Sequence, residues 1–153
     1  MIIRQVRPDD IDNFIEIYTK AYKDLENYKY ETKKEIKNYF KWLYKRDKEG
    51  FMVAEISGKP VGFAAGDTNW INFEGEKVLE IHEIFVLPEF RKRGIGSKLL
   101  NKILAYGIKK GRKIAELWVG KTNYKAIKFY KNFGFKEAGE WGKWLRMIKL
   151  LNS

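Results

Sequence analysis

A basic turn that contains two glycines lies between two apolar segments, and its residue types suit the binding of phosphate groups. The turn spans residues 88–97 and includes Arg91, Gly94 and Gly96. It follows an apolar, strand-like segment at residues 78–87 and leads into a helix-like run. The first amides of a helix lack intrahelical partners and carry partial positive charge, so such a turn can hold a pyrophosphate. The turn therefore predicts a site for a cofactor that carries a diphosphate.

Two common phosphate motifs do not fit this chain. The Gly-Lys pair at residues 58–59 does not form a Walker A loop, because Pro60 follows it and Val53 stands in place of the first glycine. The dinucleotide fingerprint G-x-G-x-x-G fails because Leu99 occupies the third glycine position. Glu116 lies near the distance expected for a ribose-binding acid, so dinucleotide binding remains a second possibility.

The turn does fit the pattern R-x-x-G-x-G, and a second pattern follows it along the chain. After the strand-like residues 115–119, the segment at residues 123–135 reads N-x-x-A-x-x-F-Y-x-x-x-G-F. The matching residues are Asn123, Ala126, Phe129, Tyr130, Gly134 and Phe135. In this order and register, the two patterns resemble the acyl-CoA loop and following helix of the GNAT superfamily of N-acyltransferases. The resemblance covers residues 78–135.

The resemblance implies an acetyl-CoA-dependent N-acetyltransferase that moves an acetyl group to a primary amine by direct attack in a ternary complex. In this family the strand backbone binds pantetheine, the turn binds the pyrophosphate, and a tyrosine on the later helix protonates the departing thiolate. That tyrosine corresponds to Tyr130. The implied cofactor-binding residues are Phe85, Val86, Leu87, Arg91, Lys92, Arg93, Gly94, Ile95, Gly96, Ser97, Asn123, Ala126 and Tyr130.

A base is also needed, because an amine near neutral pH is mostly protonated and does not attack a thioester. We rank Glu83 first, since we expect it between Ile81 and Phe85 on one side of the strand, where loss of solvent would raise its pKa. It could instead be a surface carboxylate paired with a lysine, and a chain of waters could serve as the base. The other candidates are Glu80, His82 and Glu116.

The elements that position these residues follow from the apolar patterns and the turn residues. We expect strands at residues 2–7, 51–57, 61–70, 78–87, 113–119, 135–140 and 143–150, and helices at residues 8–22, 32–45, 95–110 and 123–133. Residues 32–35 form a capping box. The order βααβββαβαββ is that of the GNAT fold. It implies an α/β (α+β) class with a mixed, mostly antiparallel sheet of six to seven strands and about four helices, splayed between the fourth and fifth strands.

Composition bounds the kind of protein. The 153 residues contain 44% hydrophobic residues and no linker-like segment, so we expect one domain over residues 1–153. No cysteine and a single histidine argue against disulfides and a metal site, and neither a signal peptide nor a membrane-spanning run is recognisable. We therefore expect a cytoplasmic protein. Its composition, which is rich in charged residues and contains no cysteine, also suits a protein from a hot environment.

The acceptor and the partners remain open. The net charge of +11 comes from lysines spread among acidic residues, although Lys92, Arg93, Lys98, Lys125, Lys128 and Lys131 flank the expected cofactor cleft. The acceptor is a small amine, a polyamine, a protein N-terminus or a lysine, and we expect it near residues 25–35, with Glu26, Tyr28, Tyr30 and Glu31. We expect no membrane or nucleic-acid partner, and a homodimer is possible. The alternative is a non-catalytic module that binds CoA or nucleic acid, the latter through Tyr28, Tyr30, Tyr39, Trp42 and Tyr44.

Overall fold

The computed structural model describes residues 1–25 and 28–152. One sheet contains seven strands, in the spatial order β1-β2-β3-β4-β5-β7-β6. The strands are β1 Ile2–Gln5, β2 Phe51–Ile56, β3 Lys59–Ile71, β4 Lys77–Val86, β5 Ile114–Gly120, β6 Lys136–Trp141 and β7 Trp144–Leu150. The α-helices are α1 Ile11–Ala21, α2 Lys33–Arg46, α3 Ile95–Lys109 and α4 Tyr124–Asn132.

Every neighbouring pair of strands is antiparallel except β4 and β5, which run parallel. This arrangement confirms the predicted fold class and element order. The connection from β4 to β5 contains α3, as a parallel pair requires. Helices α1 and α2 lie between β1 and β2, and α4 and β6 lie between β5 and β7. Within the described residues, no helix is long and apolar enough to cross a membrane.

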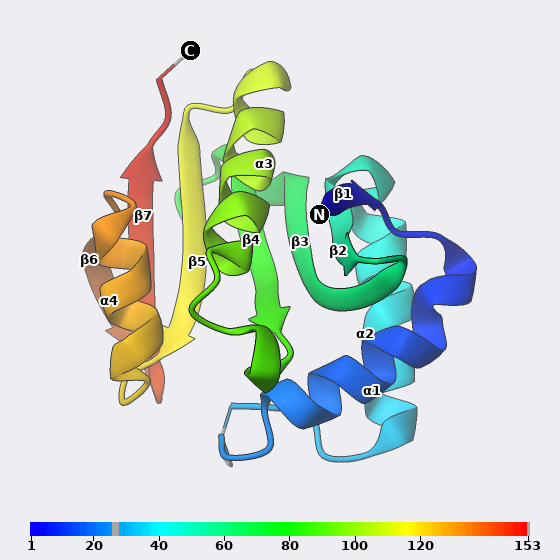
Figure 1. Cartoon of the computed structure of the whole chain (residues 1–153). Helices are drawn as coiled ribbons and strands as arrows, with labels where there is room; N and C mark the ends of the chain where they lie inside the picture. Colours follow the sequence, from blue (N-terminus) through cyan, green and yellow to red (C-terminus); the bar gives the residue numbers. More distant parts are fainter. Residues whose placement is uncertain (26–27, 153) are drawn as a thin grey trace.

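Two apolar clusters lie on opposite faces of the sheet (Figure 1). Helix α3 buries its apolar stripe, including Leu99, Leu100 and Ile103, against one face, and α4 packs on the same side. Helices α1 and α2 cover the other face with a cluster rich in aromatic rings, in which Phe14 contacts six others. The sheet thus lies between two helical layers, as expected from the amphipathic patterns.

Some boundaries differ from the predicted ones for local reasons. The predicted first helix is divided, because Pro8–Asp10 form a 3-10 turn and α1 begins only at Ile11. The Asp10 carboxylate holds that turn by accepting from the Arg7 amide and pairing with Arg4. The capping box at Thr32 is confirmed, with Glu35 returning the bond.

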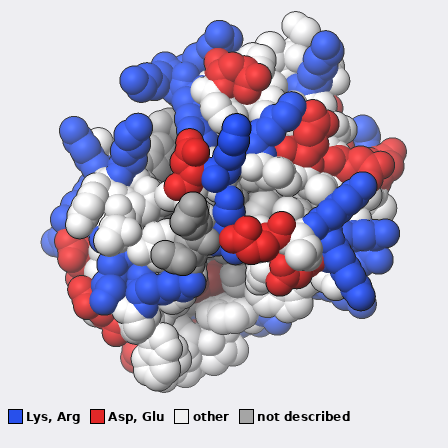
Figure 2. Space-filling model, turned by 90° about the horizontal axis from the view of Figure 1, so that it is seen from below, with Lys and Arg blue, Asp and Glu red and all other residues white. Residues whose placement is uncertain are grey.

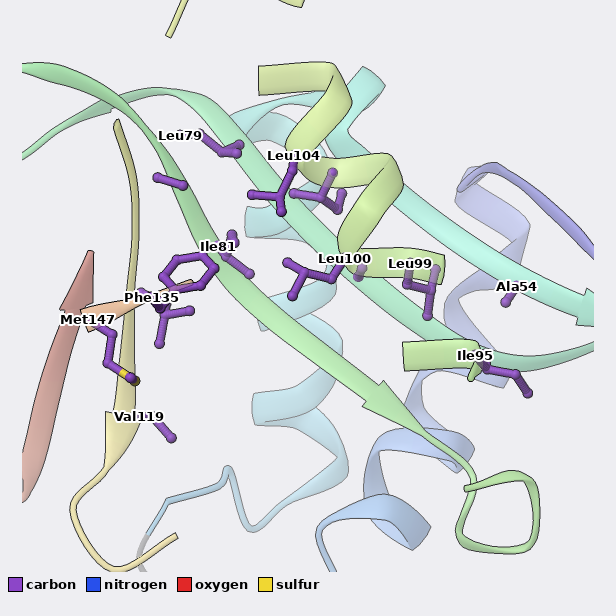
Figure 3. Close-up of a cluster of buried hydrophobic side chains, with 14 of the residues drawn as sticks. Ala54, Leu79, Ile81, Ile95, Leu99, Leu100, Leu104, Val119, Phe135 and Met147 are labelled. Atoms are coloured by element: carbon purple, nitrogen blue, oxygen red, sulfur yellow. The ribbon is translucent and has the colours of Figure 1, made fainter. Parts of the chain in front are cut away.

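The predicted arrangement of side chains along β4 is wrong at one point. Ile81 packs with Leu79 in the cluster under α3 (Figure 3), whereas Phe85 belongs to the cluster under α1 and α2. The cause is a β-bulge: Ala65 of β3 pairs with Glu83 and the next residue pairs with Ile81, which leaves His82 without a partner. A bulge interrupts the alternation of side chains. As a result His82 and Glu83 both face α1 and α2.

The two parallel strands separate soon after they meet. The β4–β5 pairing covers only Leu79–Ile81 of β4 and Ala115–Leu117 of β5. Beyond these residues β4 remains bonded to β3 and β5 to β7, and the two strands diverge (Figure 1). The sheet therefore opens at the predicted place.

Candidate active site

A cavity of about 600 Å³ lies where β4 and β5 diverge. Its walls come from α1, α2, β4, β5, α4 and the turn between β6 and β7. Aromatic side chains form the largest group in the lining, and the charged ones include two carboxylates, Glu80 and Glu83, and two lysines, Lys29 and Lys143. A cavity of this size that combines apolar walls with a small number of charged groups is typical of a small-molecule site.

Glu83 lies in this cavity between two tyrosines from different helices. The Tyr39 hydroxyl donates to Glu83 Oε2 over 2.6 Å, and the Tyr22 hydroxyl donates to Glu83 Oε1. Burial raises the pKa of Glu83 to about 7, and the two hydroxyl bonds limit that rise because they favour the ionised form. No lysine pairs with Glu83 among the described residues, so the surface ion pair considered for it is wrong. The carboxyl group can both accept and release a proton near neutral pH.

Tyr130 enters the same cavity from α4. Its ring packs against Phe129 and Phe135, which fixes its direction. Burial, together with the nearby charge of Glu83, raises the pKa of the Tyr130 hydroxyl above its usual value. The hydroxyl therefore stays protonated and available as a donor.

The glycine-bearing turn leads directly into α3 at the mouth of the opening. Gly94 has a left-handed backbone with φ 77°, and Lys92 has φ 64°. No side chain caps the N-terminus of α3 within the described residues. Figure 2 shows the face seen from below Figure 1, where many lysine and arginine side chains stand among fewer acidic ones. The first amides of α3 are thus free of a side-chain cap in a basic setting that suits an anion.

Several residues predicted for the cofactor site also have structural contacts. The Arg91 guanidinium donates to the Ala21 carbonyl over 2.7 Å and so ties the turn to the end of α1. The Asn123 side chain caps α4 by accepting from the Ala126 amide, and both residues line the cavity. The side chains of Ile95 and Phe85 are buried in the two cores, which leaves only their backbone for a ligand.

Two of the lower-ranked bases are engaged elsewhere. Glu116 is buried, accepts from Arg146 over 2.5 Å and from Asn72 over 2.7 Å, and does not line the cavity. A role for Glu116 as a base or as a ribose-binding acid is therefore wrong. His82 also lines the cavity, but its Nε2 lies 2.9 Å from the Asp67 carboxylate and its ring packs against two tryptophan rings.

The similarities to known proteins agree with this geometry. A family model described as "Acetyltransferase (GNAT) family" matches residues 11–135. The chain belongs to that family. Membership confirms the predicted GNAT superfamily and the assignment as an acyltransferase.

Two archaeal relatives of this GNAT chain are named uncharacterized N-acetyltransferases. One, from Methanocaldococcus jannaschii, is 56% identical over 148 residues, which is 96% of this chain but 66% of its own length. The other, from Archaeoglobus fulgidus, is 58% identical over 131 residues, 85% of this chain and 89% of its own. A crystal structure of a Pyrococcus horikoshii protein covers 99% of both chains with 38% identity and a TM-score of 0.89.

The partners of Glu83 in this GNAT chain were not assigned to the site from the sequence. The sequence alone indicates a helix-packing or base-stacking role for Tyr39, and it places Tyr22 only at the end of a helix. Both lie far from Glu83 along the chain, by 44 and 61 residues. The spacing of Tyr39 and Trp42 on α2 was the available signal, because both point from one helix face toward β4.

The segment between α1 and α2 reaches the cavity, as predicted for the acceptor side. Tyr28 packs on Trp144, and its hydroxyl lies 2.9 Å from the Thr122 hydroxyl. Tyr30 lines the cavity, and its amide donates to the Tyr18 hydroxyl. Glu26, which was predicted for the same region, lies outside the described residues. This part of the cavity is therefore bounded by aromatic rings from both ends of the chain.

Proposed function

We propose that this chain is an N-acetyltransferase that moves an acetyl group from acetyl-CoA to a primary amine in a ternary complex. The observation that carries the proposal is the meeting of Glu83 and Tyr130 in one cavity at the opening of the sheet. One group has a pKa near neutral, and the other remains a proton donor. Amine acylation needs this pair of functions.

The residues present fit acetyl-CoA. The uncapped start of α3, with Gly94 in a left-handed conformation, suits the diphosphate. Amides of Lys92, Arg93, Gly94, Ile95, Gly96 and Ser97 would hold it, and the β4 backbone at Phe85, Val86 and Leu87 would bind the pantetheine arm. When bound, acetyl-CoA supplies an electrophilic thioester carbonyl. The half of β4 that has left β5 offers an unpaired strand edge for the amides of that arm.

Glu83 acts as the general base. Its ionised carboxylate takes a proton from the acceptor ammonium, and the freed nitrogen lone pair forms the new C–N bond. Tyr22 and Tyr39 hold both carboxylate oxygens, so the group is oriented before the acceptor arrives. A pKa of about 7 leaves a large ionised fraction at neutral pH while keeping the carboxylate basic.

Tyr130 acts as the general acid. As the C–S bond breaks, its hydroxyl donates a proton to the departing thiolate sulfur. After the C–N bond has formed, the nitrogen loses its second surplus proton to solvent and becomes the amide. Solvent returns a proton to Tyr130, and the proton held by Glu83 leaves to solvent, so each turnover releases one proton in net. The raised pKa of Tyr130 keeps the proton in place until the sulfur becomes basic.

The proposal is tested by titration with acetyl-CoA and by release of free thiol in the presence of a panel of primary amines. We expect binding, amine-dependent thiol release, and a fall in kcat of about 10²-fold or more in Tyr130→Phe. Tyr124→Phe is the matched control, because Tyr124 lies on the same helix, is exposed and does not line the cavity. Failure to bind acetyl-CoA, or equal rates in the two variants, would contradict the proposal.

The non-catalytic alternative has no comparable support. The tyrosines and tryptophan that it would use to stack bases are packed on other rings or bonded to β4. Tyr39 bonds Glu83, Trp42 packs on His82, and Tyr44 stacks on Phe40. These contacts favour a structural and catalytic use of the aromatic residues.

A further inference from the structure

Glu80 is a second carboxylate in the cavity, and the mechanism above does not use it. It is 3% exposed, lines the cavity wall, and its Oε1 atom has no hydrogen-bond partner among the described residues. A buried polar atom without a partner costs free energy and is rare in native proteins. Such an atom facing a cavity indicates a missing ligand group.

The charges around Glu80 are already paired with one another. Across the sheet, Arg146 of β7 binds both Glu116 and Glu74, while Asp67 of β3 binds Arg46 and lies beside His82. Arg146 Nε is also buried without a hydrogen-bond partner among the described residues, but no hydrogen bond or ion pair joins Arg146 to Glu80. Burial is the largest cause that raises the pKa of Glu80 to about 9; the charges of Glu116 and Asp67 also raise it, and the charge of Arg146 lowers it. Glu80 therefore lies near two other carboxylates and has no cation bonded to it among the described residues.

The distance between Glu80 and Glu83 sets the length of a ligand that contacts both carboxylates. Both face α1 and α2, three residues apart on β4, so their Cα atoms are separated by about 10 Å or somewhat less at the bulge. Glu80 lies on the last paired rungs of β4 and β5, at the closed end of the opening, opposite Glu116. Glu83 lies beyond that point. A ligand with one group beside Glu83 therefore needs only a short alkyl chain to place a second group beside Glu80.

The wall between these two carboxylates suits a positively charged alkyl chain. Tyr18, Tyr30, Tyr39 and Trp118 line the cavity together with them. Aromatic faces attract cations and also pack well on methylene groups. The combination of aromatic walls and a terminal carboxylate is therefore complementary to an alkylammonium.

We propose that Glu80 binds a second, positively charged nitrogen of the acceptor while the first nitrogen is acetylated beside Glu83. The inference rests on the proposed N-acetyltransferase function and narrows its acceptor to amines that carry a second ammonium or guanidinium group. Two sources share this chemistry: a free diamine, and a peptide N-terminus followed by a basic side chain.

The first arm of the test compares putrescine with n-butylamine, which differ only in the second nitrogen. We expect kcat/KM to be at least about tenfold higher for putrescine, since a charge-assisted hydrogen bond is worth that much or more. Glu80→Gln should lower kcat/KM for putrescine by about tenfold, mainly through KM, and leave n-butylamine unchanged. Glu49→Gln, an exposed carboxylate in the 3-10 turn before β2, is the control for a general loss of charge.

The second arm repeats the comparison with tripeptides that carry lysine or norleucine at the second position. Preference for the lysine peptide identifies a peptide acceptor, and preference for putrescine alone identifies a free diamine. If Glu80→Gln lowers kcat/KM equally for the charged and neutral members of both pairs, or for neither, the proposal is overturned.

A binding measurement decides the proposal even if none of these amines is acetylated. Calorimetric titration with putrescine in the presence of CoA, in two buffers of different ionisation enthalpy, measures proton release. We expect the wild type to release close to one proton more than Glu80→Gln at pH 7.5, because the bound cation would ionise Glu80, while any release from Glu83 is common to both. Equal proton release in both overturns the proposal. Absence of acetyl transfer to every amine, with this difference retained, would contradict the N-acetyltransferase function alone.

Discussion

Strand β4 separates two regions of the molecule that are built in different ways. On one side, Leu79 and Ile81 join a continuous apolar core under α3 (Figure 3). On the other side, α1 and α2 bury Phe85, whereas Glu83 and Glu80 of the same strand line a cavity. A packed face contributes stability, whereas the incompletely covered face keeps room for a ligand and desolvates the groups that line it.

The largest effect expected on the cavity side follows from Glu83→Gln. The amide cannot take the acceptor proton, so kcat/KM should fall by about 10²- to 10⁴-fold at pH 7 with the fold retained. Initial rates of thiol release measure it. Because the acceptor loses its own proton at higher pH, the deficit should shrink as pH rises. Glu16→Gln, which removes a carboxylate paired with Lys20 on the surface of α1, should leave the rate unchanged. A variant as active as the wild type would contradict the assignment.

The corresponding change on the packed side is Leu100→Ala. Leu100 is completely buried, so the substitution leaves a hole under α3 and should lower the free energy of unfolding by about 3 to 4 kcal/mol. Chemical denaturation measures the loss, and the pH profile of the remaining native enzyme should not move. Leu150→Ala, at a position that is 71% exposed, is the control. A loss below about 1 kcal/mol in Leu100→Ala would show that the two faces differ less than we infer.

The pH dependence of stability gives another comparison of the two faces, because Glu80 lies on the cavity side. Its pKa is raised from 4.5 to about 9 in the folded chain, so above pH 4.5 the unfolded chain loses a proton that the folded chain retains. Stability should therefore fall as pH rises toward 9. Glu83 contributes in the same direction only up to about pH 7. The window from pH 7 to 9 thus reports Glu80, and the expected loss is about 2 to 3 kcal/mol.

Glu80→Gln should remove the loss of stability between pH 7 and 9. Thermal unfolding of the wild type and the variant at pH 7, 8 and 9 measures the difference, which should grow with pH in favour of the variant. Parallel curves over this window would mean that Glu80 is ionised in the folded chain already at pH 7, in contrast to the raised pKa that its burial indicates.

The smallest expected effect concerns the orientation of Glu83. Tyr39→Phe removes a hydrogen bond that favours the ionised carboxylate, so the pKa of Glu83 should rise above its present value of about 7. The acidic limb of kcat/KM should move to higher pH, and activity at pH 7 should fall by about two- to fivefold. Tyr44→Phe, on the same helix but stacked on Phe40, is the control. If the acidic limb of kcat/KM stayed at the same pH, Tyr39 would contribute only packing.

Much of the fold and part of the site follow from local sequence patterns. The capping box at Thr32 and the amphipathic stripe of α3 depend on neighbouring residues, and they are found as predicted. Tyr130 was carried over from a motif, and it lines the cavity.

The placement of Glu83 and Glu80 depends on contacts that no local pattern contains. Strict alternation predicts Ile81 and Phe85 on one face, and only the pairing with β3 creates the bulge that separates them. The tyrosines that hold Glu83 come from helices 44 and 61 residues away along the chain. The isolation of Glu80 arises because Arg146 is taken by Glu116 and Glu74.

The sequence by itself determined the order of the elements, the turn before α3 and the residue types available for acid and base chemistry. These depend on short-range steric and hydrogen-bonding preferences. Only the tertiary structure decided which carboxylate is oriented and which is left unpaired, because burial and the pairing of charges are properties of groups that meet across the sheet.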